Sequence, residues 1–167
     1  MTILKYGAPP LRETSRPVEK FDGELEKLAA DMFETMYAAP GVGLAAPQVG
    51  VNIRLIVIDL SAGKEPDKKI VLCNPRIIAS DGKQDGEEGC LSVPEFMEHV
   101  TRPMKVAVEA QNIKGESFLF EGEELLARAI CHEIDHLNGV MFVDLLSPLK
   151  RALLRGKIKK LIKAGKW

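Results

Sequence analysis

The segment His132-Glu133-Ile134-Asp135-His136, followed by Leu137-Asn138-Gly139, is the stretch around which this chain is organised. On an α-helix the two histidines lie one turn apart on one face, with Cβ atoms about 6 Å apart, so both imidazoles can reach one metal ion. Glu133 lies beside that face, where its carboxylate can take a proton from a water molecule on the metal. A helix that merely carries two surface histidines fits the same string equally well. A third ligand has to decide between the two interpretations.

The composition is that of an ordinary globular protein. The 167 residues are 46% hydrophobic and 28% charged, with a net charge of −1. This length suits a single domain over residues 1–167 whose core needs no disulfides. The chain contains neither a run of 18 apolar residues nor a signal-peptide pattern, so we expect a cytoplasmic protein that is neither secreted nor membrane-bound. The totals give no sign of specific DNA binding.

The C-terminal segment differs from the rest in charge. Residues 150–167 carry eight basic side chains and no acidic ones. Because all 24 acidic and 15 of the 23 basic residues precede them, the first 149 residues carry a net charge of −9. Apolar residues at helical spacing predict an amphipathic helix over about 148–164, whose apolar stripe we expect to pack on the domain while the lysines are solvated. The stripe comprises Leu149, Leu153, Leu154, Ile158, Leu161 and Ile162.

Periodicity predicts a mixture of helices and strands in the remaining chain. Helical spacing after Asp22, a suitable N-cap, predicts a helix over 23–38, and a second helix is predicted over 123–137 with Gly139 just beyond its end. Runs of β-branched residues predict strands over 54–60 and over 70–72 with 77–78, and alternation predicts a hairpin of 105–111 with 118–120. The proline-rich start predicts an extended segment to residue 17, and residues 41–50 are expected to form a glycine-rich loop from which Gln48 projects.

The candidates for a third metal ligand are the three cysteines, His99 or a carboxylate. An odd number of cysteines without an export signal argues for a reducing compartment and against a disulfide framework. Cys131 points about 100° round the helix from His132, and Cys73 lies in an apolar strand, so both are expected to be buried filler. His99 lies among charged residues and is expected at the surface. Cys90 differs because it lies in a polar Gly-Cys-Leu-Ser-Val-Pro segment, where packing gives little reason for a thiol.

Three segments taken together resemble the signature motifs of the peptide deformylases, in order and roughly in spacing. They are Gly41-Val42-Gly43-Leu44-Ala45-Ala46-Pro47-Gln48, Glu88-Gly89-Cys90-Leu91-Ser92 and His132-Glu133-Ile134-Asp135-His136. The resemblance spans nearly the whole chain. It implies an α+β fold in which antiparallel strands surround a central helix that carries the two histidines. It also implies removal of the formyl group from N-formylmethionine of nascent polypeptides, with release of formate.

By this resemblance one divalent metal ion would be held by Cys90, His132 and His136, with water in the fourth position. Ferrous iron is the metal that the family favours, and Zn²⁺, Ni²⁺ or Co²⁺ also suit the ligands. The metal-bound water would be the nucleophile, and Glu133 would act first as general base and then as general acid. The Gln48 side-chain amide and the Leu91 backbone N–H would stabilise the oxyanion.

The same resemblance implies where the substrate and its surroundings lie. Small residues from Gly43 would let an extended peptide approach the backbone, and the methionine side chain would enter an apolar pocket. The substrate-binding residues expected are Val42, Gly43, Leu44, Leu125 and Ala129. Asp135 or Glu88 could orient the ligand histidines, and Arg102 could pair with Glu88 across the sheet. A simple solvated charge is the alternative for each.

Three further possibilities stay open at this point. The basic C-terminal helix could dock on the ribosome near the nascent chain. A different metallohydrolase could use the same helix motif, although no third His or Glu follows at the spacing of the metzincins. A non-enzymatic module with a structural metal would need a closed site of four ligands, and the sequence offers three good ones.

Overall fold

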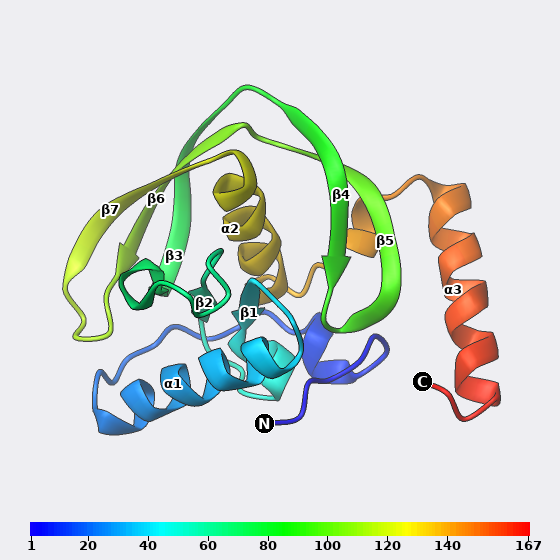
Figure 1. Ribbon diagram of the computed structural model, residues 1–167, viewed down its shortest axis with the longest axis horizontal. Coiled ribbons are helices and arrows are strands. Elements are labelled where there is room, and N and C mark those ends of the chain that lie inside the picture. The colour runs from blue at the N-terminus through cyan, green and yellow to red at the C-terminus, as the bar shows by residue number, and fades with distance from the viewer.

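The computed structural model describes residues 1–167 and has an α+β fold of three helices and two antiparallel sheets (Figure 1). The expected fold class is therefore confirmed. The helices are α1 (Gly23–Ala38), α2 (Glu124–Leu137) and α3 (Pro148–Lys163). The strands are β1 (Gly43–Ala45), β2 (Leu55–Ile58), β3 (Ile70–Asp81), β4 (Gln84–Cys90), β5 (Val93–Arg102), β6 (Lys105–Gln111) and β7 (Ser117–Glu123).

The larger sheet has the strand order β1-β2-β3-β6-β7 and is covered by α1 on one face and α2 on the other. All four residues of β2 are buried, because successive side chains point to opposite faces and both faces are covered. Ile56 and Ile58 pack towards α2, and Leu55 and Val57 pack towards α1. The helix with the two histidines is thus held against a fully formed core.

The smaller sheet is the β4–β5 hairpin, which arches over α2 from the ends of β3 and β6 (Figure 1). Its Cα register runs from Gln84 opposite Arg102 to Gly89 opposite Met97, with an irregularity before Cys90. A third core cluster joins the hairpin to the segment after α2, through Cys90, Phe142 and Val143 among others. The hairpin therefore brings β4 to the face of α2 that the larger sheet leaves open.

Most expected elements are confirmed. Helix α1 begins after Asp22, whose side chain accepts hydrogen bonds from the N–H groups of Glu24 and Leu25. Helix α2 ends before Gly139, which has a left-handed φ of 71°. The hairpin of β6 and β7 is paired throughout the predicted segments.

One expectation needs correction, and one element was not expected. The predicted loop over residues 41–50 contains the edge strand β1 and a short 3₁₀ helix, Ala46–Val49. The strand expected over 70–72 with 77–78 is confirmed as β3, although register shifts interrupt its pairing with β6. The β4–β5 hairpin was not predicted, because the sequence of β4 is polar and glycine-rich and lacks β-branched residues.

Helix α3 lies along one side of the molecule beside β5 (Figure 1). Of its apolar stripe only Leu154 and Ile158 are buried, whereas Leu149, Leu153 and Ile162 are exposed. The expectation that the whole stripe packs on the domain is therefore wrong for these three residues, because the helix contacts the domain along a narrow line only. None of the helices is long and apolar enough to span a membrane.

Candidate active site

Three ligand-type side chains converge between α2 and the end of β4. The Cys90 Sγ atom lies 3.2 Å from His136 Nε2, and that atom lies 3.2 Å from His132 Nε2. All three ligand atoms lie within 4.8 Å of one another, and all three residues are buried. Any two ligand atoms of a tetrahedral zinc-type site are about 3.3 to 3.6 Å apart. The spacing and the donor set of one sulfur and two nitrogens therefore fit a tetrahedral divalent metal ion.

Glu88 fixes the orientation of His132. Its Oε2 atom lies 2.9 Å from His132 Nδ1, so Nε2 of that ring faces Cys90 and His136. Arg102 donates to both Glu88 oxygens at 2.7 and 2.9 Å and to Asp135 at 2.7 Å. Burial raises the pKa of Glu88, but hydrogen bonds from Arg102 and His132 outweigh it and lower that pKa to about 2. Glu88 is thus a carboxylate that holds its histidine, and Asp135 acts on the site through Arg102 only.

The environments of the two histidines favour different protonation states. Burial and the neighbouring His132 lower the pKa of His136, so its ring is neutral and has a free nitrogen lone pair. Burial lowers the pKa of His132 too, but hydrogen bonds with Cys90 and Glu88 raise it above the ordinary value. A metal ion would compete with a proton for the His132 nitrogen.

Glu133 lies beside the three ligand residues in a dry environment. It is 4% exposed, and its Oε2 atom has no hydrogen-bond partner. Burial raises the pKa of Glu133 to about 7, although the charge of His132 opposes the shift. A Cβ atom at Gly43 would clash with Glu133 Oε1, so any other residue there would force this carboxylate to move. A carboxyl group with such a pKa can both accept and donate a proton near neutral pH.

Gln48 is buried at the same site instead of projecting from a loop. Its Oε1 atom accepts a hydrogen bond from the Ala45 N–H at 2.9 Å. This fixes the amide so that Nε2 points towards Cys90 Sγ, 3.6 Å away, and Ser92 Oγ, 3.1 Å away. The amide N–H group is thereby held beside the Cys90 sulfur, where it could contact a bound carbonyl oxygen.

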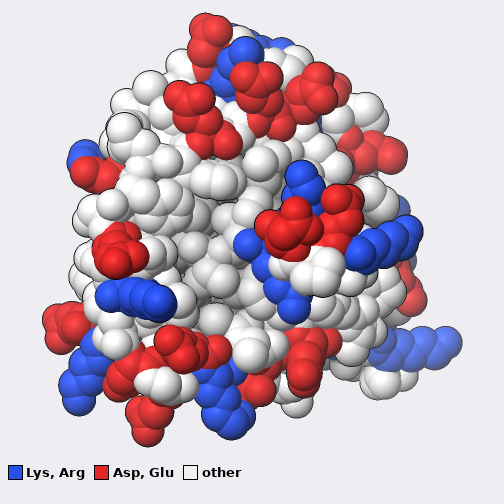
Figure 2. All heavy atoms as spheres, turned by 60° about the vertical axis from the view of Figure 1, so that its left-hand side comes forward, with Lys and Arg blue, Asp and Glu red and all other residues white.

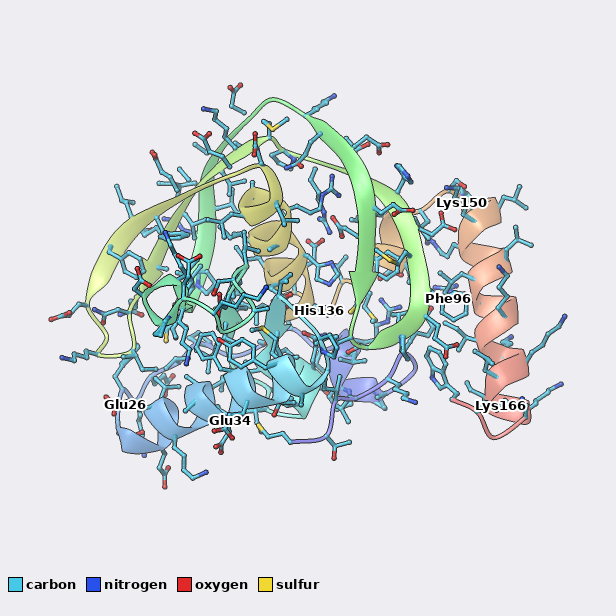
Figure 3. The ribbon with its side chains drawn as sticks, viewed as in Figure 1. Glu26, Glu34, Phe96, His136, Lys150 and Lys166 are labelled. Atoms are coloured by element: carbon cyan, nitrogen blue, oxygen red, sulfur yellow. The ribbon has the colours of Figure 1, made fainter.

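A cavity of about 700 Å³ opens beside the ligand residues and contacts Cys90, His132 and Glu133. Four of the expected substrate-binding residues line it, together with Leu91 and Gln48: Val42, Gly43, Leu125 and Ala129. Leu44 does not line it, because its side chain is fully buried in the core under α1. Figure 3 shows His136 on the lower part of α2, on the side that faces the β4–β5 hairpin.

The other candidate residues lie away from this centre. Cys73 and Cys131 are buried, and burial raises the pKa of each thiol to about 11. His99 is exposed and lies 2.8 Å from an Asp85 carboxylate oxygen. Cys90 is thus the one cysteine that the fold brings to the two histidines.

Arg128 is the buried site residue that the sequence interpretation missed. It lies one helical turn before His132 and lines the cavity, and its guanidinium reaches β4 and β5. The i, i+4 spacing to His132 was the available signal, because it places both residues on one face of α2. An arginine on a helix is usually solvated, so this signal carried little weight.

The fold and the site together define a class of protein: an α+β hydrolase whose helix carries an HExxH motif facing a cysteine. The sequence model described as polypeptide deformylase matches residues 1–152. The chain is 54% identical to a peptide deformylase of Acidobacterium capsulatum over 165 residues, which are 99% of this chain and 97% of that protein. It is 51% identical to a peptide deformylase of Acinetobacter baumannii, over 98% of this chain and 92% of that one.

Solved structures agree with these sequence matches. The crystal structure of a peptide deformylase from Legionella pneumophila superposes with a TM-score of 0.91 at 49% identity, covering 98% of this chain and 96% of that chain. The chain belongs to the polypeptide deformylase family, and it is an enzyme of that family, a hydrolase.

Proposed function

We propose that residues 1–167 act as one unit that removes the formyl group from N-formylmethionine of nascent polypeptides and releases formate. The observation that carries this proposal is the convergence of Cys90, His132 and His136 on one point beside Glu133, at the wall of a cavity. Family membership supports the reaction. The spacing of the ligand atoms supports a metal-dependent mechanism.

Cys90, His132 and His136 would hold one divalent ion, and its Lewis acidity would lower the pKa of the attacking water. We propose ferrous iron as the native ion, while Zn²⁺, Ni²⁺ and Co²⁺ also suit a thiolate with two imidazoles. Glu88 keeps His132 in the tautomer that presents Nε2 to the ion.

Glu133 moves the protons in this proposal. Its carboxylate takes the proton of the attacking water and later delivers a proton to the amine of the departing methionine. Burial supports this role, because it raises the pKa of Glu133 to about 7 and leaves one carboxylate oxygen without a partner in the protein.

Two donors would stabilise the negative charge that develops on the formyl oxygen. The first is Gln48 Nε2, which the bond between Oε1 and the Ala45 N–H holds next to Cys90. The second is the Leu91 backbone N–H, directly after the sulfur ligand and at the cavity wall. Donors fixed before the reaction begins stabilise the transition state without further reorganisation.

The free edge of β1 would position the peptide. Val42 O accepts a bond from the Asp59 N–H, so Val42 faces the β2 side and the next residue, Gly43, has its N–H and C=O on the free edge. An extended peptide can add there as a further strand. Val42, Leu125 and Ala129 would contact the methionine side chain, and the buried side chain of Leu44 would take no part.

The ribosome would be a partner through α3, in the cytoplasm. The support is the charge of this helix segment, with eight basic and no acidic side chains over residues 150–167. Most of these side chains are exposed, and Figure 3 shows Lys150 and Lys166 at its two ends. Exposed lysine side chains can contact the phosphates of the RNA backbone.

The test is formate release from formyl-Met-Ala-Ser, compared with the acetylated and free-amine peptides. We expect formate from the first peptide and no cleavage of the other two. Cleavage of a peptide bond in any of them would instead indicate an endopeptidase or aminopeptidase. Under anaerobic conditions we expect faster formate release with Fe²⁺ than with Zn²⁺, and equal rates would contradict the choice of metal.

A further inference from the structure

Arg128 connects α2 to both strands of the β4–β5 hairpin. Its Nη1 atom donates to Val100 O at 2.8 Å, to Glu88 Oε1 at 3.0 Å and to Gly86 O at 3.2 Å. Its Nη2 atom lies 3.4 Å from Gln84 O. The side chain is buried, so these bonds form away from bulk water.

Arg102 connects the same two elements, but its side chain extends from the hairpin to α2. It extends from β5, holds both Glu88 oxygens and reaches Asp135 on α2. The two arginines and the two carboxylates balance in charge, and every Glu88 oxygen has two partners. Glu88 is therefore fixed from both sides of the interface, and both Arg128 and His132 tie it to α2.

The metal ligands lie on the two elements that this interface joins. Cys90 ends β4, two residues after Glu88, whereas His132 is one turn after Arg128 on α2. A shift of the hairpin along the helix would change the distance between the Cys90 sulfur and the histidines. Hydrogen bonds from the Arg128 guanidinium to the main-chain carbonyl groups of Gly86 and Val100 oppose such a shift.

We infer that Arg128 is a positioning residue for the metal centre, which it supports by holding Glu88 and the β4–β5 hairpin in register with α2. This inference rests on the proposed metal-dependent function. A planar guanidinium can donate to a carboxylate and to several carbonyl groups at once, whereas a lysine ammonium is a point charge. Both the charge and the shape of the side chain are therefore needed.

The test measures the Co²⁺ dissociation constant by chelator competition and the visible spectrum of the bound Co²⁺. Arg128→Met keeps an apolar stem of similar length and removes the guanidinium. We expect it to weaken Co²⁺ binding about 10-fold and to shift the spectrum, because groups that orient ligands contribute that much to metal affinity. Arg128→Lys should recover part of the affinity. Arg76→Met, which removes an exposed arginine paired with Glu109, is the matched control and should bind as the wild type does.

A double-mutant cycle with Glu88→Gln separates positioning from general stability. If Arg128 acts through Glu88, Arg128→Met should cost far less Co²⁺ affinity in the Glu88→Gln background than in the wild type. Equal losses in both backgrounds, or an unchanged dissociation constant in Arg128→Met, would overturn the inference.

Gly86→Ala is a second probe in case Arg128→Met fails to fold. A Cβ atom there would lie 3.0 Å from Arg128 Nη2, so the guanidinium would have to shift by a few tenths of an ångström without being removed. Weaker Co²⁺ binding in this variant supports the inference, and wild-type binding contradicts it. A wild-type chain that binds no Co²⁺ would overturn the proposed function as well, whereas unaltered binding in the Arg128 and Gly86 variants would overturn only the role of Arg128.

Discussion

Helices α2 and α3 have similar lengths, 14 and 16 residues, and both carry apolar residues at helical spacing, yet they are buried very differently. Ten residues of α2 are buried, against two of α3. The larger sheet, the hairpin and the segment after α2 enclose α2, whereas α3 touches the domain along one narrow line. The same periodicity therefore gave a central helix in one place and a peripheral one in the other.

This contrast in burial determines where a catalytic site can be built. Around α2, buried polar groups such as Glu88, Arg102 and Arg128 bond to one another, which fixes them in place. Most charged side chains of α3 are exposed to solvent, where salt screens their interactions. A reaction that needs ligands placed to within fractions of an ångström requires the first environment. Changes near α2 should therefore affect catalysis strongly and changes on α3 weakly.

The largest effect is expected for Glu133→Ala in α2. Loss of the group that moves protons should lower kcat for formate release by about 10²- to 10⁴-fold. The control is Glu34→Ala, which removes an exposed glutamate of α1 (Figure 3) and should leave kcat unchanged. The measurement is steady-state kinetics on formyl-Met-Ala-Ser. A Glu133→Ala variant with wild-type kcat would show that Glu133 does not transfer the protons.

Gln48→Glu should have the next largest effect. The substitution keeps the oxygen that accepts from the Ala45 N–H and removes the N–H group beside Cys90. Loss of one oxyanion donor typically lowers kcat about 10²- to 10³-fold. The measurement is kcat at saturating substrate. A change confined to KM would mean that Gln48 binds the substrate equally in the ground state and the transition state.

Glu88→Ala should weaken metal retention about 10- to 100-fold, because His132 loses the carboxylate that orients it. The loss is measured as the rate of metal release to a chelator. The control is Glu123→Ala, because the exposed Glu123 side chain bonds only to Lys105 on the neighbouring strand. Identical release rates for Glu88→Ala and the wild type would remove Glu88 from the site.

On the α3 side, we expect a modest dependence of stability on pH through Asp144. Burial raises the pKa of Asp144, but Arg12 and the Met141 N–H outweigh it and hold that pKa below its ordinary value of 3.8. Because the folded-state pKa is lowered, this stabilisation is present above pH 3.8 and is lost as the pH falls through the lowered pKa. Asp144→Asn should therefore be less stable than the wild type at pH 6 and lose this difference in strong acid.

Thermal unfolding midpoints between pH 6 and pH 2 measure that difference. Asp67→Asn, at an exposed position in the short 3₁₀ helix Pro66–Lys68, is the control and should follow the wild type at every pH. A constant offset between Asp144→Asn and the wild type over this range would show that the carboxylate charge is not the cause.

The smallest effect on catalysis is expected from Lys157→Glu, Lys160→Glu and Lys163→Glu combined, all exposed on α3. Formate release from short peptides should not change, because none of these residues reaches the cavity. Co-sedimentation with ribosomes should fall, and its salt dependence should become shallower. Unaltered co-sedimentation would exclude these lysines from ribosome binding.

The sequence was sufficient where local pattern and tertiary packing agree. Helix α1 has its N-cap at Asp22, α2 ends before Gly139, and β6 alternates because one face packs on α2. The three short motifs also placed Cys90, Gln48 and the two histidines in one family pattern. The structure then put these side chains side by side.

The sequence was insufficient where the structure of a segment depends on a partner that is distant in sequence. Strand β4 is polar and contains glycines, and it is a strand because β5 pairs with it and Arg128 bonds to its carbonyl groups. The partners of Arg128 lie 28 to 44 residues away in sequence, beyond the range of any local pattern. Leu44 was expected at the substrate, but alternation along β1 turns its side chain into the core.

The number of metal ions bound per chain in cysteine variants tests whether Cys90, His132 and His136 hold a metal ion. Cys90→Ala should lose the bound ion, because the fold brings this thiol alone to His132 and His136. Cys131→Ala removes an equally buried thiol next to His132 and should keep one ion per chain. A full equivalent of metal in Cys90→Ala, or its loss in Cys131→Ala, would show that Cys90 is not the thiol that holds the ion.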